Sequence, residues 1–114
     1  MTISVTESQG ARALKVNVTD AVLHVELADG RTLTVPTVWY PRLAHGSHRE
    51  RSRWELIGGG VGIHWPELDE DISVEGLLAG RRSGEAPQSL KRWLSLRVSR
   101  AGRPTKAMTR RPRR

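Results

Sequence analysis

The first third of the chain alternates hydrophobic and polar residues with a period of two, which is typical of strands with one buried face. The alternation predicts strands over residues 13–18, 22–27 and 31–35. In the first of these, Leu14, Val16 and Val18 form the expected buried face. Asp29 and Gly30 accept the positive φ that a tight hairpin turn requires, so we expect the second and third strands to be antiparallel neighbours.

Short helices and short strands are expected in the middle of the chain. Val38, Trp39 and Leu43 recur at helical spacing before Gly46, and Ser47 and Glu50 have the S-x-x-E spacing of a capping box. The capping box predicts a second helix over residues 48–54, whose solvated surface carries Arg49, Glu50, Arg51 and Arg53. Further along, the pattern predicts extended segments at 54–57 and 63–65, an acidic loop at 68–72, a helix that begins after Ser73, and a last helix opened by Pro87. The expected fold class is α+β: a small antiparallel meander with two to four short helices.

Length and composition restrict the class of protein. The 114 residues favour one domain, since domains most often have roughly 100–150 residues. There is no cysteine, which excludes disulfides and thiolate chemistry. No apolar run approaches the ~18 residues of a membrane span, and the N-terminus lacks the order of a signal peptide. We therefore expect a cytoplasmic protein without membrane contact.

Charge divides the chain into two parts. Residues 1–80 carry seven Lys or Arg and eleven Asp or Glu, a net −4, whereas residues 81–114 carry twelve and one, a net +11. The expected organisation is a flexible segment 1–10, an α+β domain 11–84, a helix 85–97 and a basic disordered tail 98–114. Such a tail is either a solvated terminus or a segment that binds polyanions.

The tail contains a short motif for nucleic-acid binding. Gly102-Arg103-Pro104 with basic flanks resembles the core of an AT-hook, whose extended Arg-Pro chain fits the minor groove. Ala101 stands where that motif has an Arg directly before the Gly, so non-specific phosphate contact is the simpler alternative. The candidate nucleic-acid contacts are Arg100, Arg103, Lys106, Arg110, Arg111, Arg113 and Arg114.

A second cluster of ionisable residues lies in the body. His64 and the run Asp69, Glu70 and Asp71 could in principle bind a divalent metal or divide acid and base roles. Adjacent carboxylates in a loop diverge, however, so turn and helix-capping roles are the preferred interpretation, and we expect no metal and no cofactor. The remaining hypothesis is a partner-binding patch of His64, Trp65, Asp69, Glu70 and Asp71. For Trp65 a place in the core is the preferred interpretation, and a role as the anchor of this patch is the alternative. No motif assembles a nucleophile, a base and an oxyanion site, so we do not expect an enzyme.

Several separated motifs occur together in one order. They are ELADGR at 26–31, VP at 35–36, WYPRL at 39–43, Trp54, and GVGIHWPELDEDISVEGLL at 60–78. In this order they resemble the bacterial domain-of-unknown-function family numbered 2442, over about residues 11–84. The resemblance implies a small α+β domain of short antiparallel strands and helices, with no established activity and therefore no catalytic residue to transfer. The chain departs from the family pattern at His48, where proline is more usual, and in its basic tail.

The resemblance also bears on function. Some relatives resemble a module joined to a helix-turn-helix domain, and in many bacteria such genes are thought to lie beside a second small gene, as in a toxin–antitoxin pair. The expected function is a protein-interaction module, an antitoxin-like member of a two-gene pair, whose partner is a small protein encoded next to it. The alternative is a nucleic-acid-binding protein that contacts DNA or RNA weakly through the tail.

Overall fold

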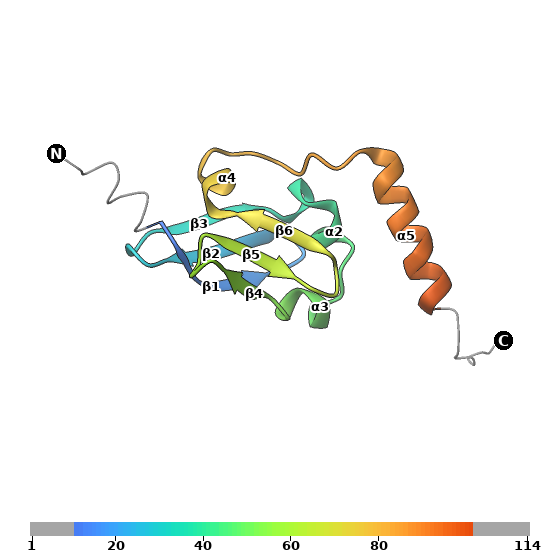
Figure 1. Ribbon diagram of the computed structural model, residues 1–114, viewed down its shortest axis with the longest axis horizontal. Helices are drawn as coiled ribbons and strands as arrows, with labels where there is room; N and C mark the ends of the chain where they lie inside the picture. Colours follow the sequence, from blue (N-terminus) through green and yellow to red (C-terminus); the bar gives the residue numbers. More distant parts are fainter. Residues whose placement is uncertain (1–10, 102–114) are drawn as a thin grey trace. The chain divides into compact units, whose positions relative to one another are not determined.

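The computed structural model describes residues 11–101, with side chains described up to Val98. The chain divides into two compact units, the first ending at Ser83 and the second beginning at Gly84. The first unit contains β1 (Ala13–Val18), β2 (Val22–Leu27), β3 (Thr32–Pro36), η1 (Thr37–Trp39), α2 (Pro41–Ala44), α3 (His48–Ser52), β4 (Glu55–Ile57), β5 (Gly62–Trp65), β6 (Glu70–Ser73) and α4 (Val74–Leu78) (Figure 1). The second contains α5 (Pro87–Ala101). The α+β class is confirmed, and no helix among residues 11–101 has the length and apolarity to cross a bilayer.

The first sheet is the predicted meander, with strand order β1-β2-β3 and antiparallel pairing throughout. Gly30 adopts φ +93° in the hairpin turn, and Asp29 accepts a hydrogen bond from the amide of Arg31. The prediction that Leu14 faces the core is wrong, because its side chain is 60% exposed while Ala13 is buried. The register shifts between Ala13 and Lys15, and such a bulge reverses the faces of the residues on one side of it.

The second sheet has the order β4-β5-β6 and includes a strand that the sequence analysis treated as a loop. Residues 68–72 were expected to form an acidic loop, but Glu70–Ser73 pairs with β5, with Ile63 opposite Ile72. Only the turn before β6 is irregular, and Asp69 adopts φ 51° there. The acidic side chains concealed the period-two pattern, in which Ile72 alone is buried between two exposed neighbours.

The core lies between the inward faces of the two sheets, which Figure 1 shows one in front of the other. The buried side chains are Ala13, Val16, Val18, Leu23, Val25 and Leu27 from the first sheet and Ile63, Trp65 and Ile72 from the second. The sheets are also joined through the backbone, since the amide of Ala13 donates to the carbonyl of Gly60 at 2.8 Å. At Gly60, which adopts φ +108°, a Cβ would come within 2.6 Å of the Ala13 oxygen, so this close approach requires glycine.

Arg51 is buried, although the sequence analysis placed it on a solvated helix surface. Only 7% of the residue is exposed. Its Nε donates to the carbonyl of Leu43 at 2.8 Å, its Nη2 to Ala44 at 2.9 Å, and its Nη1 to the carboxylate of Asp20 at 2.7 Å. The guanidinium thus supplies donors to carbonyls at the end of α2, where the helix itself provides few. The capping box of Ser47 and Glu50 is present as predicted, and the helix that it begins ends at Ser52 rather than Trp54.

The segment that follows α4, at the end of the first unit, is held against the residues around η1 by two hydrogen bonds. The Tyr40 hydroxyl donates to the carbonyl of Arg81 at 2.6 Å, and the amide of Ser83 donates to Trp39 at 3.0 Å. Burial raises the pKa of Tyr40, and the charge of Glu70 raises it further. The phenol therefore stays protonated and able to donate.

Two helix predictions need adjustment. Ser73 caps α4 as expected, because its hydroxyl accepts from the amide of Gly76 at 2.9 Å. Leu78 was expected in the buried stripe of this helix but is 41% exposed. In the second unit, α5 continues to Ala101, so residues 98–101 of the expected tail are helical. Residues 1–10 and 102–114 lie outside the described residues.

The role of Arg51 predicts a specific loss of stability. Replacing it with methionine (Arg51→Met) keeps the volume but removes the side-chain donors to the Leu43 and Ala44 carbonyls, which should lower the free energy of unfolding by about 2 kcal/mol. Loss of the ion pair with Asp20 adds little to this decrease, because the Asp20 side chain is 97% exposed and water can replace the guanidinium as its partner. Urea denaturation measures the effect, with Arg53→Met as the control, since the Arg53 side chain is 52% exposed. Equal stability of the two variants would contradict the structural role of Arg51.

Candidate interaction surface

The outward side of the second sheet carries four side chains that we call the outer face: Glu55, Ile57, His64 and Asp71. Strand register places them there, since Glu55 pairs with His64 and His64 with Asp71, while Ile57 pairs with Gly62. Residues that alternate with them, Ile63 and Trp65, point into the core. The same alternation that buries the hydrophobic residues of β5 therefore presents His64 outward.

Three members of the outer face form a row across the sheet. Directly opposite residues in neighbouring strands have Cβ atoms about 4.5–5.5 Å apart, so His64 lies between two carboxylates. Its Nδ1–H donates a hydrogen bond to the Asp71 carboxylate. The Asp71 side chain remains 69% exposed and that of His64 31% exposed. The row is therefore an accessible and predominantly negative surface.

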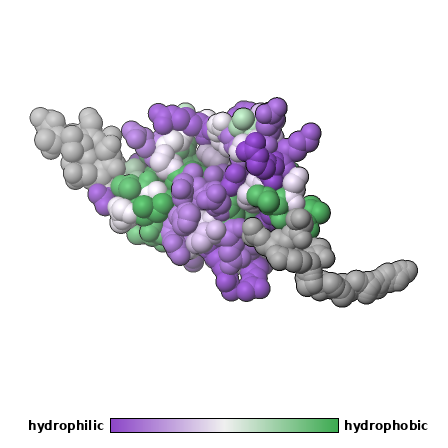
Figure 2. All heavy atoms as spheres, turned by 45° about the vertical axis from the view of Figure 1, so that its right-hand side comes forward, coloured by the Kyte–Doolittle hydropathy of each residue, from purple (hydrophilic) through white to green (hydrophobic). Residues whose placement is uncertain are grey.

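Exposed apolar residues lie next to this row, on β4 and its turn. Ile57 of the outer face is 44% exposed and Val61 in the turn is 49% exposed, whereas Leu56, at 37%, lies on the inward side of the same strand by its pairing with Ile63. Ile57 lies beside Gly62, where an added Cβ would be 3.7 Å from the Ile57 Cβ. Figure 2 shows apolar patches of this kind interrupting a mostly hydrophilic surface. The outer face thus combines apolar area with charge.

The structure divides the predicted patch. His64 and Asp71 lie together on the outer face, but Trp65 is fully buried, and its indole N–H donates to the Arg51 carbonyl at 3.1 Å. Trp65 is therefore a core residue and does not anchor a surface. Asp69 closes the turn before β6 with its Oδ2 3.4 Å from Arg42, and Glu70 accepts a hydrogen bond from the amide of Asp71 at 3.2 Å.

Two residues of the outer face, Glu55 and Ile57, were not identified from the sequence. The sequence pattern predicts extended segments on both sides of the glycine-rich turn at Gly58–Gly60, and together these make a hairpin. Pairing these segments across Gly58–Gly60 would have placed Glu55 near His64. The signal was therefore present, but it required the exact register of the hairpin, which the four-residue turn sets.

The acidic run does not converge on a metal site. Among the described residues, no group of three or more His, Asp or Glu is arranged to hold a metal ion. Asp69 pairs with Arg42, Glu70 with a backbone amide, and Asp71 with His64. The three carboxylates therefore have three different partners.

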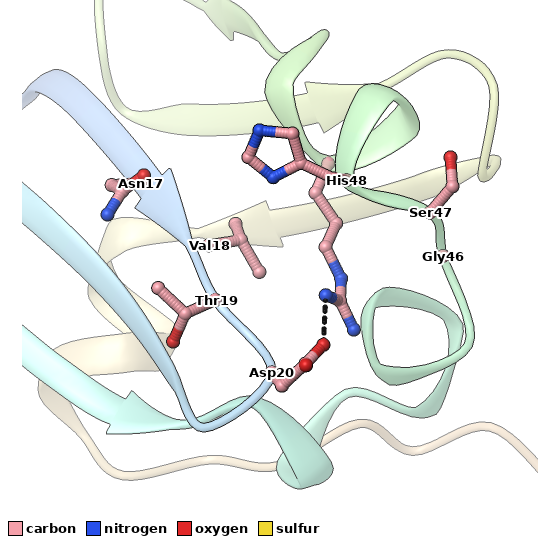
Figure 3. Close-up of a pocket in the computed structure, with 8 residues that line it drawn as sticks. Asn17, Val18, Thr19, Asp20, Gly46, Ser47 and His48 are labelled. Carbon is pink, nitrogen blue, oxygen red and sulfur yellow. Dashed lines mark hydrogen bonds and ion pairs between the residues drawn. The ribbon is translucent and has the colours of Figure 1, made fainter.

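A polar pocket of about 460 Å³ lies between the β1–β2 turn and the start of α3 (Figure 3). Its lining includes Asn17, Asp20, His48 and Arg51. The Asp20 carboxylate accepts a hydrogen bond from the guanidinium of Arg51, and the other donors of that guanidinium go to backbone carbonyls. The charged groups of the pocket thus pair with each other and support the connection between α2 and α3.

The candidate nucleic-acid contacts lie almost entirely beyond the described part of the chain. The backbone of Arg100 belongs to α5. Arg103, Lys106, Arg110, Arg111, Arg113 and Arg114 lie outside the described residues. Within α5, the guanidinium of Arg97 lies over the ring of Trp93, 4.7 Å from its centroid.

Comparison with known proteins agrees with the division into units. The sequence model of the family described as "Protein of unknown function (DUF2442)" matches residues 13–83, ending where the first unit ends. No curated protein matches the chain significantly.

Two solved structures are similar. A protein of unknown function from Rhodospirillum rubrum is 33% identical, with a TM-score of 0.58 over 67% of this chain and 94% of that one. An uncharacterized protein from Chromobacterium violaceum is 22% identical, with a TM-score of 0.59 over 80% of this chain and 84% of that one. The second likeness concerns the fold alone.

The separate partners of the acidic residues predict how the protein responds to metal ions. Addition of Mg²⁺, Mn²⁺ or Zn²⁺ should leave the melting temperature unchanged, because no set of ligands converges in the described residues. A metal present at 100 times its dissociation constant would raise stability by about 2.7 kcal/mol. Differential scanning calorimetry distinguishes these results, and a clear upward shift that Asp71→Asn abolishes would establish a metal site instead.

Proposed function

The chain belongs to the DUF2442 family of proteins of unknown function, and we propose that its first unit is a protein-interaction module that binds through the outer face. The observation that carries the proposal is the combination of exposed Ile57 and Val61 with the row of Glu55, His64 and Asp71. Protein interfaces typically have an apolar centre surrounded by polar groups. The second sheet offers both within one short hairpin and its neighbouring strand.

The use of four serine hydroxyls favours a binding role over catalysis by a serine nucleophile; the hydroxyl that does contact a histidine, that of Thr34 with His24 at 3.2 Å, belongs to a threonine in the first sheet. The hydroxyls of Ser47 and Ser73 accept from backbone amides, and that of Ser52 donates to a backbone carbonyl. The Ser89 hydroxyl donates to Glu85. None of these four serines is bonded to a histidine, which a serine nucleophile would need as its base.

The chemistry of the outer face favours a basic partner. Its two carboxylates, Glu55 and Asp71, flank a single histidine, so positive side chains on a partner would be attracted to the row. A small basic protein encoded beside this chain would fit, and the chain would then be the antitoxin-like member of the pair. We place this pairing in the cytoplasm, in keeping with a chain that has no cysteine.

Nucleic-acid binding through the C-terminal end is the second candidate. The observation that favours it is that α5, which carries Lys91, Arg92 and Arg97, continues to Ala101 and leads directly into the basic segment. Helix and segment would then act as one polyanion-binding arm, while the first unit binds a protein. The two roles are compatible.

The interaction module is tested with a captured and purified partner. The tagged chain is used to isolate bound proteins from its native cell, the partner is identified by mass spectrometry, and its affinity for the purified chain is measured by titration calorimetry. Ile57→Asp and Asp71→Lys should each weaken binding by about tenfold or more, because they disrupt the apolar and the acidic parts of the outer face. Circular dichroism confirms that the variants fold.

Leu14→Asp is the matched control. Leu14 is 60% exposed and lies on β1 of the first sheet, so this variant also adds a charge to an exposed apolar position but should bind normally. Unchanged affinity of both outer-face variants would contradict the proposed surface. Binding to duplex DNA that disappears when residues 84–114 are removed would support the second candidate.

A further inference from the structure

The two sheets of the first unit have four edge strands, and these differ in how well they are protected. The edges are β1 and β3 in the first sheet and β4 and β6 in the second. An edge strand presents unpaired backbone N–H and C=O groups, which can pair with a strand from another chain unless the edge is covered, bent or charged. The question is which edge is open to such pairing.

Three edges are obstructed. β1 carries the bulge between Ala13 and Lys15, packs against α3, and already donates from Ala13 to the carbonyl of Gly60. β3 ends in Pro36, which has no N–H, and packs against α4. β6 leads directly into α4 and packs against it, and the amide of Val74 bonds to Val61.

The fourth edge, β4, is open. All three residues of Glu55–Ile57 are exposed, and within the described part of the chain β4 pairs only with β5. In an antiparallel ladder, alternate residues direct their N–H and C=O groups away from the existing partner. β4 therefore has backbone groups directed toward a further strand, beside the exposed side chains of Leu56 and Ile57.

We infer that β4 receives an extended, basic segment of the partner protein as a fourth strand of the second sheet. This inference rests on the proposed function and specifies how the outer face binds. Backbone hydrogen bonds to β4 would supply affinity, and the side chains that lie beside β4 would supply specificity. The occupant is a strand with a particular side-chain pattern rather than a folded surface.

The side chains of β4 define that pattern. Glu55 and Ile57 point outward and Leu56 lies on the inward side of the sheet, by their pairing with His64, Gly62 and Ile63. Opposite-charge pairs and apolar β-branched pairs stabilise directly facing positions. The added strand should therefore place an Arg or Lys opposite Glu55 and apolar β-branched residues opposite Leu56 and Ile57.

Charge also argues against a second copy of this chain as the occupant. If the β4 strands of two copies paired antiparallel with Leu56 opposite Leu56, Glu55 of one copy would face the apolar Ile57 of the other. If they paired with Glu55 opposite Glu55, two carboxylates would face each other, and like charges at directly opposite positions are destabilising. Neither register offers Glu55 a basic neighbour.

The test uses the full-length chain and synthetic peptides. The probe is a fluorescent valine–arginine peptide that repeats Val-Val-Arg, so that an arginine can face Glu55 while valines face Leu56 and Ile57. A valine–glutamate peptide, with glutamate in place of each arginine, is the charge control, and a proline-interrupted valine–arginine peptide is the backbone control. Anisotropy measures affinity, and amide hydrogen exchange by NMR locates the peptide. The valine–arginine peptide should bind best and protect amides of β4, because it supplies both backbone donors and basic side chains.

A pair of charge reversals provides matched variants. Glu55→Lys should lower the affinity for the valine–arginine peptide by about threefold to tenfold and raise the affinity for the valine–glutamate peptide. Glu26→Lys makes the same change at an exposed position of β2, the central strand of the first sheet. This variant should leave unchanged both the order of peptide affinities and the protection of the β4 amides from hydrogen exchange.

Several results would overturn the inference. These are protection at another edge in place of β4, binding that survives the interrupting proline, or a dimer in light scattering whose β4 amides are already protected without peptide. If the captured partner binds the outer face but no peptide protects β4, strand addition is wrong and the interaction module stands. If the outer-face variants bind that partner normally, the proposed function itself is wrong.

Discussion

The buried guanidinium of Arg51 connects parts of the first unit that are distant in the sequence. Its side chain bonds to the end of α2 and to Asp20 in the β1–β2 turn, and its own carbonyl accepts the indole N–H of Trp65 in β5. One residue thus links the first sheet, the short helices and the second sheet. A core of this size contains few large side chains, so a polar connection that also fixes Trp65 has a large share in defining the packing.

The hydrogen bond from Trp65 to Arg51 helps to set which side of the second sheet faces the core, and this in turn determines which side chains form the outer face. With Trp65 held in the core, strand alternation directs His64 outward, and register then sets Glu55 and Asp71 on either side of it. The short hairpin adds Ile57 and Val61, which no helix of the first unit buries. The proposed binding surface is therefore the outward side of a sheet whose inward side builds the core.

Features that depend on local sequence were predicted well. The meander, the capping box of Ser47 and Glu50 and the cap at Ser73 each follow from a few neighbouring residues. Leu14 could not be placed, because a bulge changes the phase of a strand without a clear sequence signal. Burial of Arg51 could not be foreseen, because its acceptors at Leu43 and Ala44 belong to a preceding helix that must first be positioned.

The candidate site shows the same limit. His64 and Asp71 could be singled out from their residue types, but their hydrogen bond depends on β6 being a strand, and its acidic residues are typical of a loop. Glu55 became part of the surface only through cross-strand register. The sequence thus indicated which residues could take part in binding, whereas the three-dimensional structure was needed to show which of them share one face of the sheet.

The central claim is that the first unit binds its partner through the outward side of the second sheet. Hydrogen–deuterium exchange of the full-length chain, alone and in complex with the purified partner, tests this most directly. Protection should appear in peptides that cover residues 55–64 and 70–73, while the first sheet stays unchanged. Protection restricted to the first sheet, or to residues from Gly84 onward, would contradict the claim.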